Sequence, residues 1–123
     1  MFVLIVHGSR NPQWRHSLEQ LADELRKNDP SREVGLAYMQ FSGPSLEDVV
    51  MEGRSRGVQD FRILPLFMAS AGHVDKDIRP MVDDLAQRCP DIHLQLLPPV
   101  GEQPLFHQLV LTIAQNSPCG DEK

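Results

Sequence analysis

Residues 2–10 read Phe-Val-Leu-Ile-Val-His-Gly-Ser-Arg, and this stretch decides the fold. Its first part, Phe2–Val6, is an unbroken apolar run of the kind found in strands that are buried on both faces of a sheet. The run stops at His7, and Gly8 follows it. We therefore expect a buried strand whose carboxyl end delivers His7 into a loop.

Working outward, three more apolar runs occur at residues 34–41, 61–67 and 92–97. Segments with helical spacing of apolar residues separate or follow them, at about 14–25, 45–57, 74–88 and 103–115. Strands that alternate with helices predict an α/β domain wound by right-handed crossovers. We predict a single three-layer domain with a four-stranded parallel sheet, strand order 2-1-3-4, and helices on both faces.

Local signals set several helix boundaries. Ser45 and Asp48 have the spacing of a capping box, and Gly57 is suited to a left-handed C-cap. Pro80 falls inside the third helical segment, so we expect an irregular turn before it and a regular helix from that residue onward. Asp75, at the start of this segment, is expected to act as a helix cap.

The composition fits one globular domain. The chain has 123 residues, of which 41% are hydrophobic and 24% charged. We assign residues 1–115 to the domain and the polar residues 116–123 to a flexible tail. Cys89 and Cys119 lack the spacing of a zinc site or a disulfide framework, so both are expected to be free thiols.

Charge and hydropathy exclude some partners. A formal net charge of -5 argues against nucleic acid, whose binding depends on clustered Lys and Arg. No apolar run approaches the length of a membrane-spanning helix, and the first residues lack the basic start of a secretory leader. We expect a cytoplasmic protein that binds neither membrane nor nucleic acid.

The functional site is expected where the winding of the sheet reverses, between the first and third strands. The first strand ends at His7, and the third leads into Met-Ala-Ser-Ala-Gly-His at residues 68–73. His7 and His73 should therefore face each other across this point. Neutral imidazole is a common ligand of cobalt, nickel, iron and zinc, and two imidazoles leave coordination positions open. We predict that this pair binds a divalent metal.

Residues around the pair are candidates for substrate contact. Cationic side chains on the same rim could bind carboxylates of an acidic substrate, although solvated loop positions are the other interpretation. The substrate-contact candidates are Ser9, Arg10, Gly72, Lys76 and Arg79. Asp77 could orient His73. The remaining histidines, His16, His93 and His107, are expected to be solvated.

Four segments resemble the short CbiX family: VHGSRNP at 6–12, the Pro44-Ser45-Leu46 turn, ILPLFMASAGHVDKDI at 63–78, and PPVGEQPLF at 98–106. The resemblance implies a class II chelatase, similar in fold to anaerobic cobalt chelatases and ferrochelatases, that acts on sirohydrochlorin or a related macrocycle without nucleotide hydrolysis. It makes His7 and His73 the catalytic, metal-handling pair. It also implies a homodimer, because the long chelatases look like two such halves fused.

The chain departs from the family pattern at the end of the second strand. The family usually has an acidic residue there, in a Phe-Leu-Glu triplet, whereas this chain has Tyr38-Met39-Gln40. A carboxylate can accept the pyrrole protons that metal insertion releases, but Gln40 can only hydrogen-bond to the substrate. Glu47, Glu102 or one of the histidines could accept those protons instead.

The function expected from these patterns is insertion of a divalent metal, Co²⁺ or else Ni²⁺ or Fe²⁺, into a sirohydrochlorin-like tetrapyrrole. The metal is then a substrate, and no permanently bound cofactor is expected. One alternative is a metal or tetrapyrrole carrier without turnover, which Gln40 favours. A second is a phosphatase or hydrolase using His7 and Arg10, although GxSxG, GxxxxGK and GxGxxG motifs are all missing. A structural partner domain would leave the paired histidines unexplained.

Overall fold

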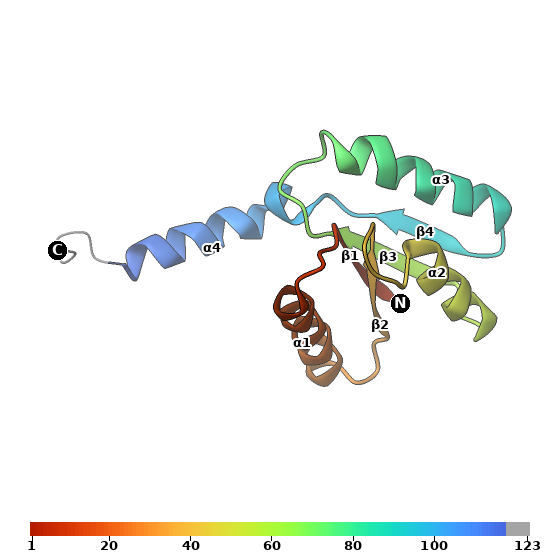
Figure 1. The fold of residues 1–123 in the computed structure, drawn as a ribbon, viewed down its shortest axis with the longest axis horizontal. Helices are drawn as coiled ribbons and strands as arrows, with labels where there is room; N and C mark the ends of the chain where they lie inside the picture. The colour runs from red at the N-terminus through yellow and green to blue at the C-terminus, as the bar shows by residue number, and fades with distance from the viewer. Residues whose placement is uncertain (118–123) are drawn as a thin grey trace.

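The sheet and its strand order are those expected from the sequence. A computed structural model describes residues 1–117, in which four parallel strands have the order β2-β1-β3-β4 (Figure 1). The strands are β1 (Phe2–Val6), β2 (Val34–Tyr38), β3 (Asp60–Pro65) and β4 (His93–Leu96). The α/β prediction and the 2-1-3-4 order are confirmed. β1 and β3 are neighbours, with Phe2 in register with Arg62 and Ile5 with Pro65.

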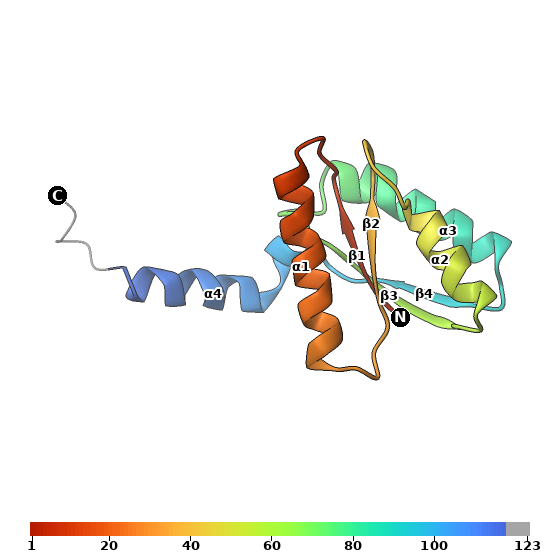
Figure 2. The ribbon, with the colours of Figure 1, turned by 60° about the horizontal axis from the view of Figure 1, so that its bottom comes forward.

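Helices cover both faces of the sheet. They are α1 (Pro12–Asn28), α2 (Leu46–Ser55), α3 (Arg79–Arg88) and α4 (Pro104–Gln115). A π-helical turn, η1 (Val74–Ile78), precedes α3, and a 3₁₀ turn, η2 (Val100–Glu102), precedes α4. Figure 2 shows α1 on one side of the sheet and α2 and α3 on the other. The helices do not cover the carboxyl ends of β1 and β3, where the loops that carry His7 and His73 begin.

The core has two parts because successive side chains of a strand point to opposite faces. Val3 and Ile5 of β1 pack toward α2 and α3, together with the fully buried Phe61 and Ile63. Leu4 and Val6 belong to the smaller cluster on the α1 side. Burying each large apolar side chain contributes about 1.5–3 kcal/mol, so both layers hold the strand ends firmly.

The boundaries of α2 follow from its sequence. Asp48 N–H donates to Ser45 Oγ at 3.1 Å, and Ser45 N–H donates to the Asp48 carboxylate at 3.0 Å, which completes the predicted capping box. Gly57 has φ +95°, a left-handed conformation that glycine adopts without strain. Both boundary predictions are confirmed.

The third helical segment begins irregularly, as Pro80 predicts. Arg79 N–H donates to Val74 O, five residues back, and the regular helix α3 runs from Arg79. Proline fits there because a residue in the first helical turn needs no N–H partner. The expectation that Asp75 caps a helix is wrong: its carboxylate instead lies 3.5 Å from Nε of Arg79, one turn later.

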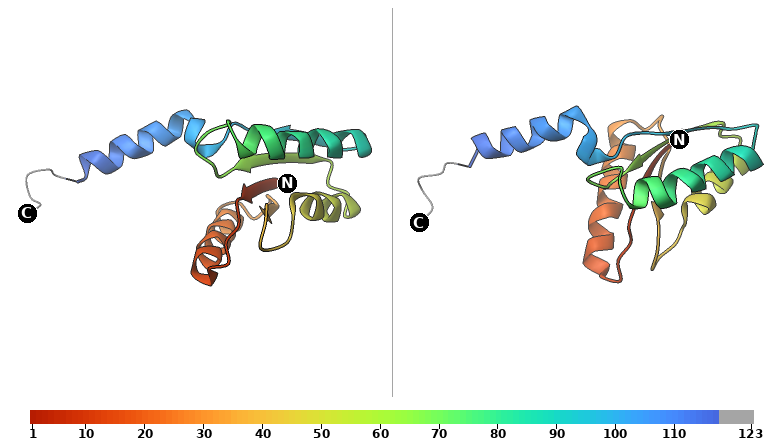
Figure 3. Two further views of the ribbon diagram at one scale, coloured as in Figure 1. Left: turned by 45° about the horizontal axis from the view of Figure 1, so that its top comes forward. Right: turned by 90° about the horizontal axis from the view of Figure 1, so that it is seen from above.

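α4 differs from the arrangement expected for a wound α/β domain. It extends away from the sheet instead of adding to either helical layer (Figures 1 and 3). Leu105 is 80% exposed and Leu109 54%. No helix among residues 1–117 is long and apolar enough to cross a membrane.

The end of the chain follows directly from α4. The backbone N–H groups of Asn116 and Ser117 still bond to the last turn of this helix. Residues 118–123, which include Cys119 and most of the predicted tail, lie outside the described residues. Cys89 is a buried free thiol.

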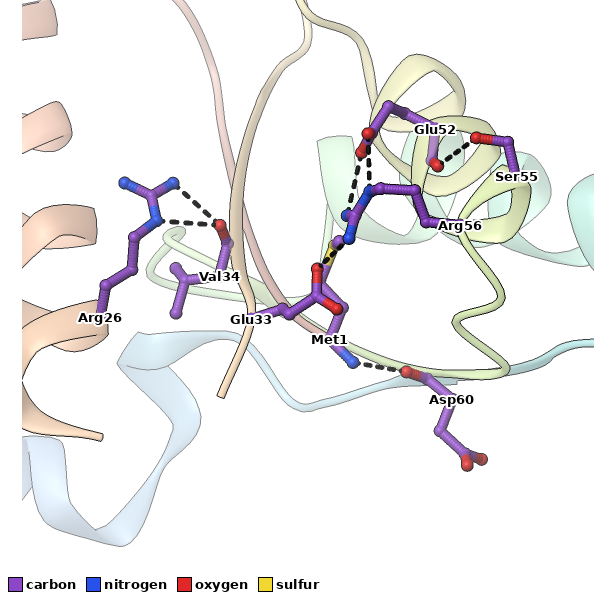
Figure 4. A network of polar contacts seen from close by, with 8 residues as sticks. All are labelled: Met1, Arg26, Glu33, Val34, Glu52, Ser55, Arg56 and Asp60. Atoms are coloured by element: carbon purple, nitrogen blue, oxygen red, sulfur yellow. Dashed lines mark hydrogen bonds and ion pairs between the residues drawn. The ribbon is translucent and has the colours of Figure 1, made fainter. Parts of the chain in front are cut away.

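A polar network ties the helices to the amino-terminal ends of the strands (Figure 4). Arg56 pairs with Glu33 at 2.6 Å and with Glu52 at 2.7 Å. Arg26 donates to Val34 O at 2.8 Å, which fastens α1 to β2. These contacts involve residues at the opposite end of the strands from His7 and His73, so they hold the scaffold without entering the site.

Candidate metal-handling site

Neighbouring strands bring the two histidines together. His7 directly follows β1, and His73 ends the loop that follows β3. Their ring centroids are 4.9 Å apart, with the planes inclined by 74°. His73 is exposed and His7 partly buried, so the pair faces solvent from the carboxyl edge of the sheet. Two imidazoles at this separation can act on one ion.

Phe67 forms the apolar side of the pair. Its ring centroid lies 6.3 Å from that of His7 and 6.0 Å from that of His73. The ring is partly buried and packs against the core cluster on the α2 and α3 side. Phe67 therefore gives both imidazoles a fixed neighbour that offers no competing ligand.

Asp77 fixes one histidine. His73 Nδ1 lies 2.9 Å from the Asp77 carboxylate, four residues later in η1. A carboxylate accepts only, so Nδ1 carries the hydrogen and the lone pair of Nε2 is free for a metal. Carboxylate–histidine pairs of this kind fix the ring orientation and the tautomer of metal ligands. The sequence already named Asp77 as a residue that could orient His73.

Gln40 contacts the other histidine. The hydrogen-bond pairing of β1 with β2 continues past the strand ends, because Met39 N–H donates to Val6 O and Gln40 N–H donates to His7 O. The Gln40 side-chain nitrogen then lies 3.2 Å from His7 Nδ1 and 3.3 Å from Nε2. It can donate to whichever ring nitrogen carries no hydrogen. The position at which the resemblance led us to expect a carboxylate is therefore directly beside His7.

Glycines make this close approach possible. Gly8 has φ +110°, and a Cβ there would collide with the carbonyl oxygen of Gln40. Gly72 has φ +88° with open space around it, so only its backbone conformation requires glycine. Its carbonyl accepts from Lys76 N–H at 2.8 Å, which begins the turn that carries Asp77.

The predicted cationic contacts flank the histidines without joining them. Arg10 lies over the ring of Phe41, with 4.7 Å from the guanidinium carbon to the ring centroid. Arg79 pairs with Asp75, and Lys76 is exposed on η1. Within residues 1–117, no hydrogen bond or ion pair connects these three cations to His7 or His73.

Ser9 has a local structural contact. Its hydroxyl oxygen accepts from Asn11 N–H at 3.0 Å, and Asn11 in turn caps α1 by accepting from Gln13 N–H at 2.9 Å. The Ser9 side chain therefore helps the chain turn from the His7 loop into α1. Its predicted contact with substrate stays a prediction.

Two exposed apolar side chains near the site escaped the sequence prediction. Phe41, which follows Gln40, is 54% exposed, and Met68, which follows Phe67, is 61% exposed. Phe41 is the last residue of the predicted apolar run 34–41 and Met68 directly follows the run 61–67, and that position was the available signal. Exposed apolar groups beside a polar pair are suited to contact a flat, partly apolar ligand.

The two glutamates considered as proton acceptors have other partners. Glu47 pairs with Arg88 at 3.0 Å. Glu102 accepts from Ser70 N–H at 2.6 Å and from the Ser70 hydroxyl at 2.8 Å. The backbone N–H of Ser70, followed by its hydroxyl, lowers the pKa of Glu102. A carboxylate stabilised in its charged form is a poorer base for the pyrrole protons. The two hydrogen bonds instead give Glu102 a structural role, because they hold the loop that leads to His73.

A separate groove of about 660 Å³ follows the outer edge of β2 between α1 and α2. Its lining includes Tyr38, whose pKa burial raises, and several charged side chains of the two helices. Neither His7 nor His73 lines it. The histidine pair therefore belongs to an open rim and not to this groove.

The family model described as CbiX matches residues 1–116. The chain belongs to the CbiX family. A solved structure of a putative cobalamin (vitamin B12) biosynthesis CbiX protein from Marinobacter aquaeolei VT8 is 30% identical, with a TM-score of 0.77 over 94% of this chain and 92% of that one. The sirohydrochlorin cobaltochelatase of Methanosarcina acetivorans is 28% identical over 92% of both chains.

Longer relatives share the fold of this CbiX chain. The sirohydrochlorin chelatase SirB of Bacillus subtilis subspecies spizizenii, solved in complex with cobalt, is 21% identical and has a TM-score of 0.76. This CbiX chain spans 49% of that chain, and its match covers 56% of the cobaltochelatase of Methanopyrus kandleri. At 21% identity, the structural similarity to SirB supports the fold alone.

Proposed function

We propose that this CbiX chain inserts a divalent metal, with Co²⁺ the first candidate, into sirohydrochlorin or a related tetrapyrrole. The observation that carries the proposal is the pairing of His7 and His73, 4.9 Å apart between ring centroids at the carboxyl edge of the sheet. Membership of the CbiX family and the names of the similar cobaltochelatases support this substrate class.

The histidines would hold the metal before transfer. His73, oriented by Asp77, offers Nε2, and His7 offers a ring nitrogen once the Gln40 amide moves aside. Two protein ligands leave positions for water and for the incoming pyrrole nitrogens. A site this open can release its ion to a ligand that supplies four nitrogens.

The macrocycle would lie across the rim. Phe41 and Met68 supply apolar contact for the ring, and Arg10 beside Phe41 can bind a peripheral carboxylate. Lys76 and Arg79 are the further cations, although Arg79 must exchange Asp75 for a substrate carboxylate. Ser9, two residues after His7, and Gly72, directly before His73, would contact the edge of the ring.

Metal insertion also releases two protons from the pyrrole nitrogens. Gln40 cannot accept them, and Glu47 and Glu102 are engaged by Arg88 and Ser70. The remaining bases at the site are the two imidazoles and the Asp77 carboxylate, and Asp77 is engaged with His73 Nδ1. Each imidazole is freed when the metal moves to the ring, so the ligands of the ion become the acceptors of the protons.

A second candidate function is a carrier that binds metal or tetrapyrrole without turnover. The contact of the Gln40 amide with His7 favours it, because an amide occupies the place of the family's base. Single-turnover insertion with purified protein and sirohydrochlorin separates the two functions. A chelatase accelerates the spectral change caused by Co²⁺, whereas a carrier binds the macrocycle and leaves the rate at that of the free reaction.

The proposal includes a homodimer. A tetrapyrrole is large compared with the rim of one such domain, so a single copy would cover little of its surface. Pairing two rims would enclose more of the ring and exclude water from the metal.

A further inference from the structure

Both oxygens of the Glu102 carboxylate bind the loop that carries His73. Ser70 N–H donates to one oxygen at 2.6 Å, and the Ser70 hydroxyl donates to the other at 2.8 Å. Glu102 is the last residue of η2, which follows β4, whereas Ser70 lies in the loop between β3 and η1. The contact therefore joins two segments that are 32 residues apart in the sequence.

η2 meets the same loop at a second point, through its backbone. Gly101 N–H donates to Phe67 O at 3.0 Å. A Cβ at Gly101 would collide with the Met68 backbone, so only glycine allows this close approach. Phe67 is the residue whose ring lies beside both imidazoles. η2 therefore holds the loop near its start and again at Ser70.

Ser70 also contacts the turn that orients His73. Its carbonyl oxygen accepts from Asp75 N–H at 2.9 Å, at the entry to η1. Asp77, two residues further along this turn, has its carboxylate 2.9 Å from His73 Nδ1. A displacement of Ser70 would therefore move the start of η1, and with it the carboxylate that fixes the tautomer of His73.

Burial of side chains does little to hold this loop in place. Four residues in its middle part are exposed: Met68, Ala69, Ala71 and Gly72. Apolar packing of the kind that fixes the strands is thus missing there, and the next fully buried side chain is that of Val74. Hydrogen bonds to a charged acceptor are stronger than bonds between neutral groups, so the Glu102 carboxylate is well suited to fix the loop.

We propose that Glu102 is a positioning residue of the metal site, which sets the orientation of His73 through Ser70. This inference rests on the proposed function, because it takes His7 and His73 as the pair that handles the metal. Within residues 1–117, no hydrogen bond or ion pair connects Glu102 to either histidine. Glu102 therefore acts through the loop and is neither a metal ligand nor the acceptor of the pyrrole protons.

The chemistry of the contact separates this positioning role from a general loss of structure. Ser70 presents two donors, and its hydroxyl oxygen can also accept. In Glu102→Gln, the carbonyl oxygen of the amide can accept from Ser70 N–H, and the amide nitrogen can donate to the hydroxyl. Glu102→Ala offers neither group. The first variant should therefore keep the loop in place without the charge, and the second should release it.

The affinity of the full-length protein for Co²⁺, measured by competition with a chromophoric chelator, tests the inference. We expect Glu102→Ala to bind Co²⁺ about 10-fold more weakly than the native chain, as for other residues that support metal-binding histidines. Glu102→Gln should bind it as the native chain does. The matched control is Gln103→Ala, which removes a 2.7 Å hydrogen bond to Pro98 O and leaves Ser70 untouched. This control should keep the native affinity.

The ring nitrogens of His73 provide a second readout, which needs no metal. Nitrogen NMR of the metal-free protein, at a pH where the ring is neutral, reports which of the two nitrogens carries the hydrogen. The native chain and Glu102→Gln should show it on Nδ1, as the contact with Asp77 requires. Glu102→Ala should shift it partly to Nε2. A side chain with only a stabilising role would lower the melting temperature and leave this signal unchanged.

A milder variant keeps the test decisive if Glu102→Ala does not fold. Ser70→Ala removes only the bond from the hydroxyl and leaves the bond from the backbone N–H. It should lower the affinity for Co²⁺ and shift the His73 hydrogen in the same direction as Glu102→Ala, to a smaller extent. A native affinity together with a native His73 signal in Ser70→Ala would contradict the proposed route.

Three further outcomes would overturn the inference. Equal affinities for Co²⁺ in Glu102→Ala and Gln103→Ala would do so. Equal losses in Glu102→Gln and Glu102→Ala would mean that the charge matters and the contact with Ser70 does not. If the native chain itself does not bind Co²⁺, the proposed function fails, but the NMR signal still decides the inference: an unchanged His73 hydrogen in Glu102→Ala overturns it.

Discussion

The Asp77 carboxylate lies 2.9 Å from Nδ1 of His73, within one turn of the same segment. This contact assigns the hydrogen of the imidazole to Nδ1 and leaves Nε2 as the metal ligand. The π-helical turn Val74–Ile78 places the Asp77 carboxylate beside His73. The regular helix α3 begins only after this turn, with Pro80 in its first turn. The orientation of the His73 ring is therefore fixed by the segment that directly follows it.

Removal of this orienting carboxylate should weaken metal binding without unfolding the protein. We expect Asp77→Ala to lower the affinity for Co²⁺ by about 10- to 100-fold, as for other partners of metal-binding histidines. Competition with a chromophoric chelator measures the affinity. Asp75→Ala is the matched control, because Asp75 belongs to the same turn but pairs with Arg79. Equal losses in both variants would argue against an orienting role.

Restoring a base beside His7 should accelerate insertion. Gln40→Glu places a carboxylate where the amide now contacts the imidazole, and this group is ionised at neutral pH. The insertion rate should rise, most clearly near pH 7. Gln40→Ala removes the amide without supplying a base and serves as the control. If Gln40→Glu is no faster than the native chain, proton removal does not limit the reaction.

The sequence was sufficient for the features that depend on local chemistry and on the periodicity of apolar residues. Buried apolar runs gave the four strands, the Ser45 and Asp48 pair gave the start of α2, and Pro80 gave the irregular entry to α3. The expectation that a site forms where the winding of the sheet reverses then predicted that His7 and His73 lie at one edge, as they do. Each of these features is set by a few neighbouring residues or by a general property of parallel sheets.

Features set by tertiary packing were not predictable in the same way. The apolar stripe of α4 indicates burial but does not say against which surface, and in this structure the stripe is exposed because α4 extends away from its own sheet. Asp75 had the position of a cap, yet Arg79 one turn later attracts its carboxylate. The contact of Gln40 with His7 depends on pairing that continues beyond the ends of β1 and β2, which apolar periodicity does not reveal.

A side chain at Gly8 should destabilise the site more than the backbone angle alone explains. Gly8 and Gly57 both have positive φ, but a Cβ at Gly8 collides with Gln40 O, whereas nothing lies within 4 Å at Gly57. Each Gly→Ala change should cost about 1–3 kcal/mol for the backbone conformation. Denaturant unfolding should show a larger loss for Gly8→Ala. Equal losses would mean that the His7 loop moves freely.

The stability that the hydrogen bonds from Ser70 to Glu102 give to the fold should depend on pH. Hydrogen bonds from Ser70 lower the pKa of Glu102, so the folded state binds its proton less readily than the unfolded state does. The stabilisation is therefore present above the ordinary pKa of Glu and is lost as the pH falls through the lowered value. The melting temperature of the native chain should exceed that of Glu102→Gln near pH 7, and the difference should shrink in acid. A difference that is constant with pH would contradict this assignment.

The most direct test of the histidine pair is the visible absorption spectrum of sirohydrochlorin with Co²⁺, followed over time with and without the protein. The native chain should accelerate the spectral change of insertion, and His7→Ala and His73→Ala should each remove the acceleration while the fold persists, because both residues lie in loops outside the core. Bound macrocycle without acceleration would support the carrier function. Acceleration that survives in both variants would contradict the assignment of His7 and His73 as the metal-handling pair.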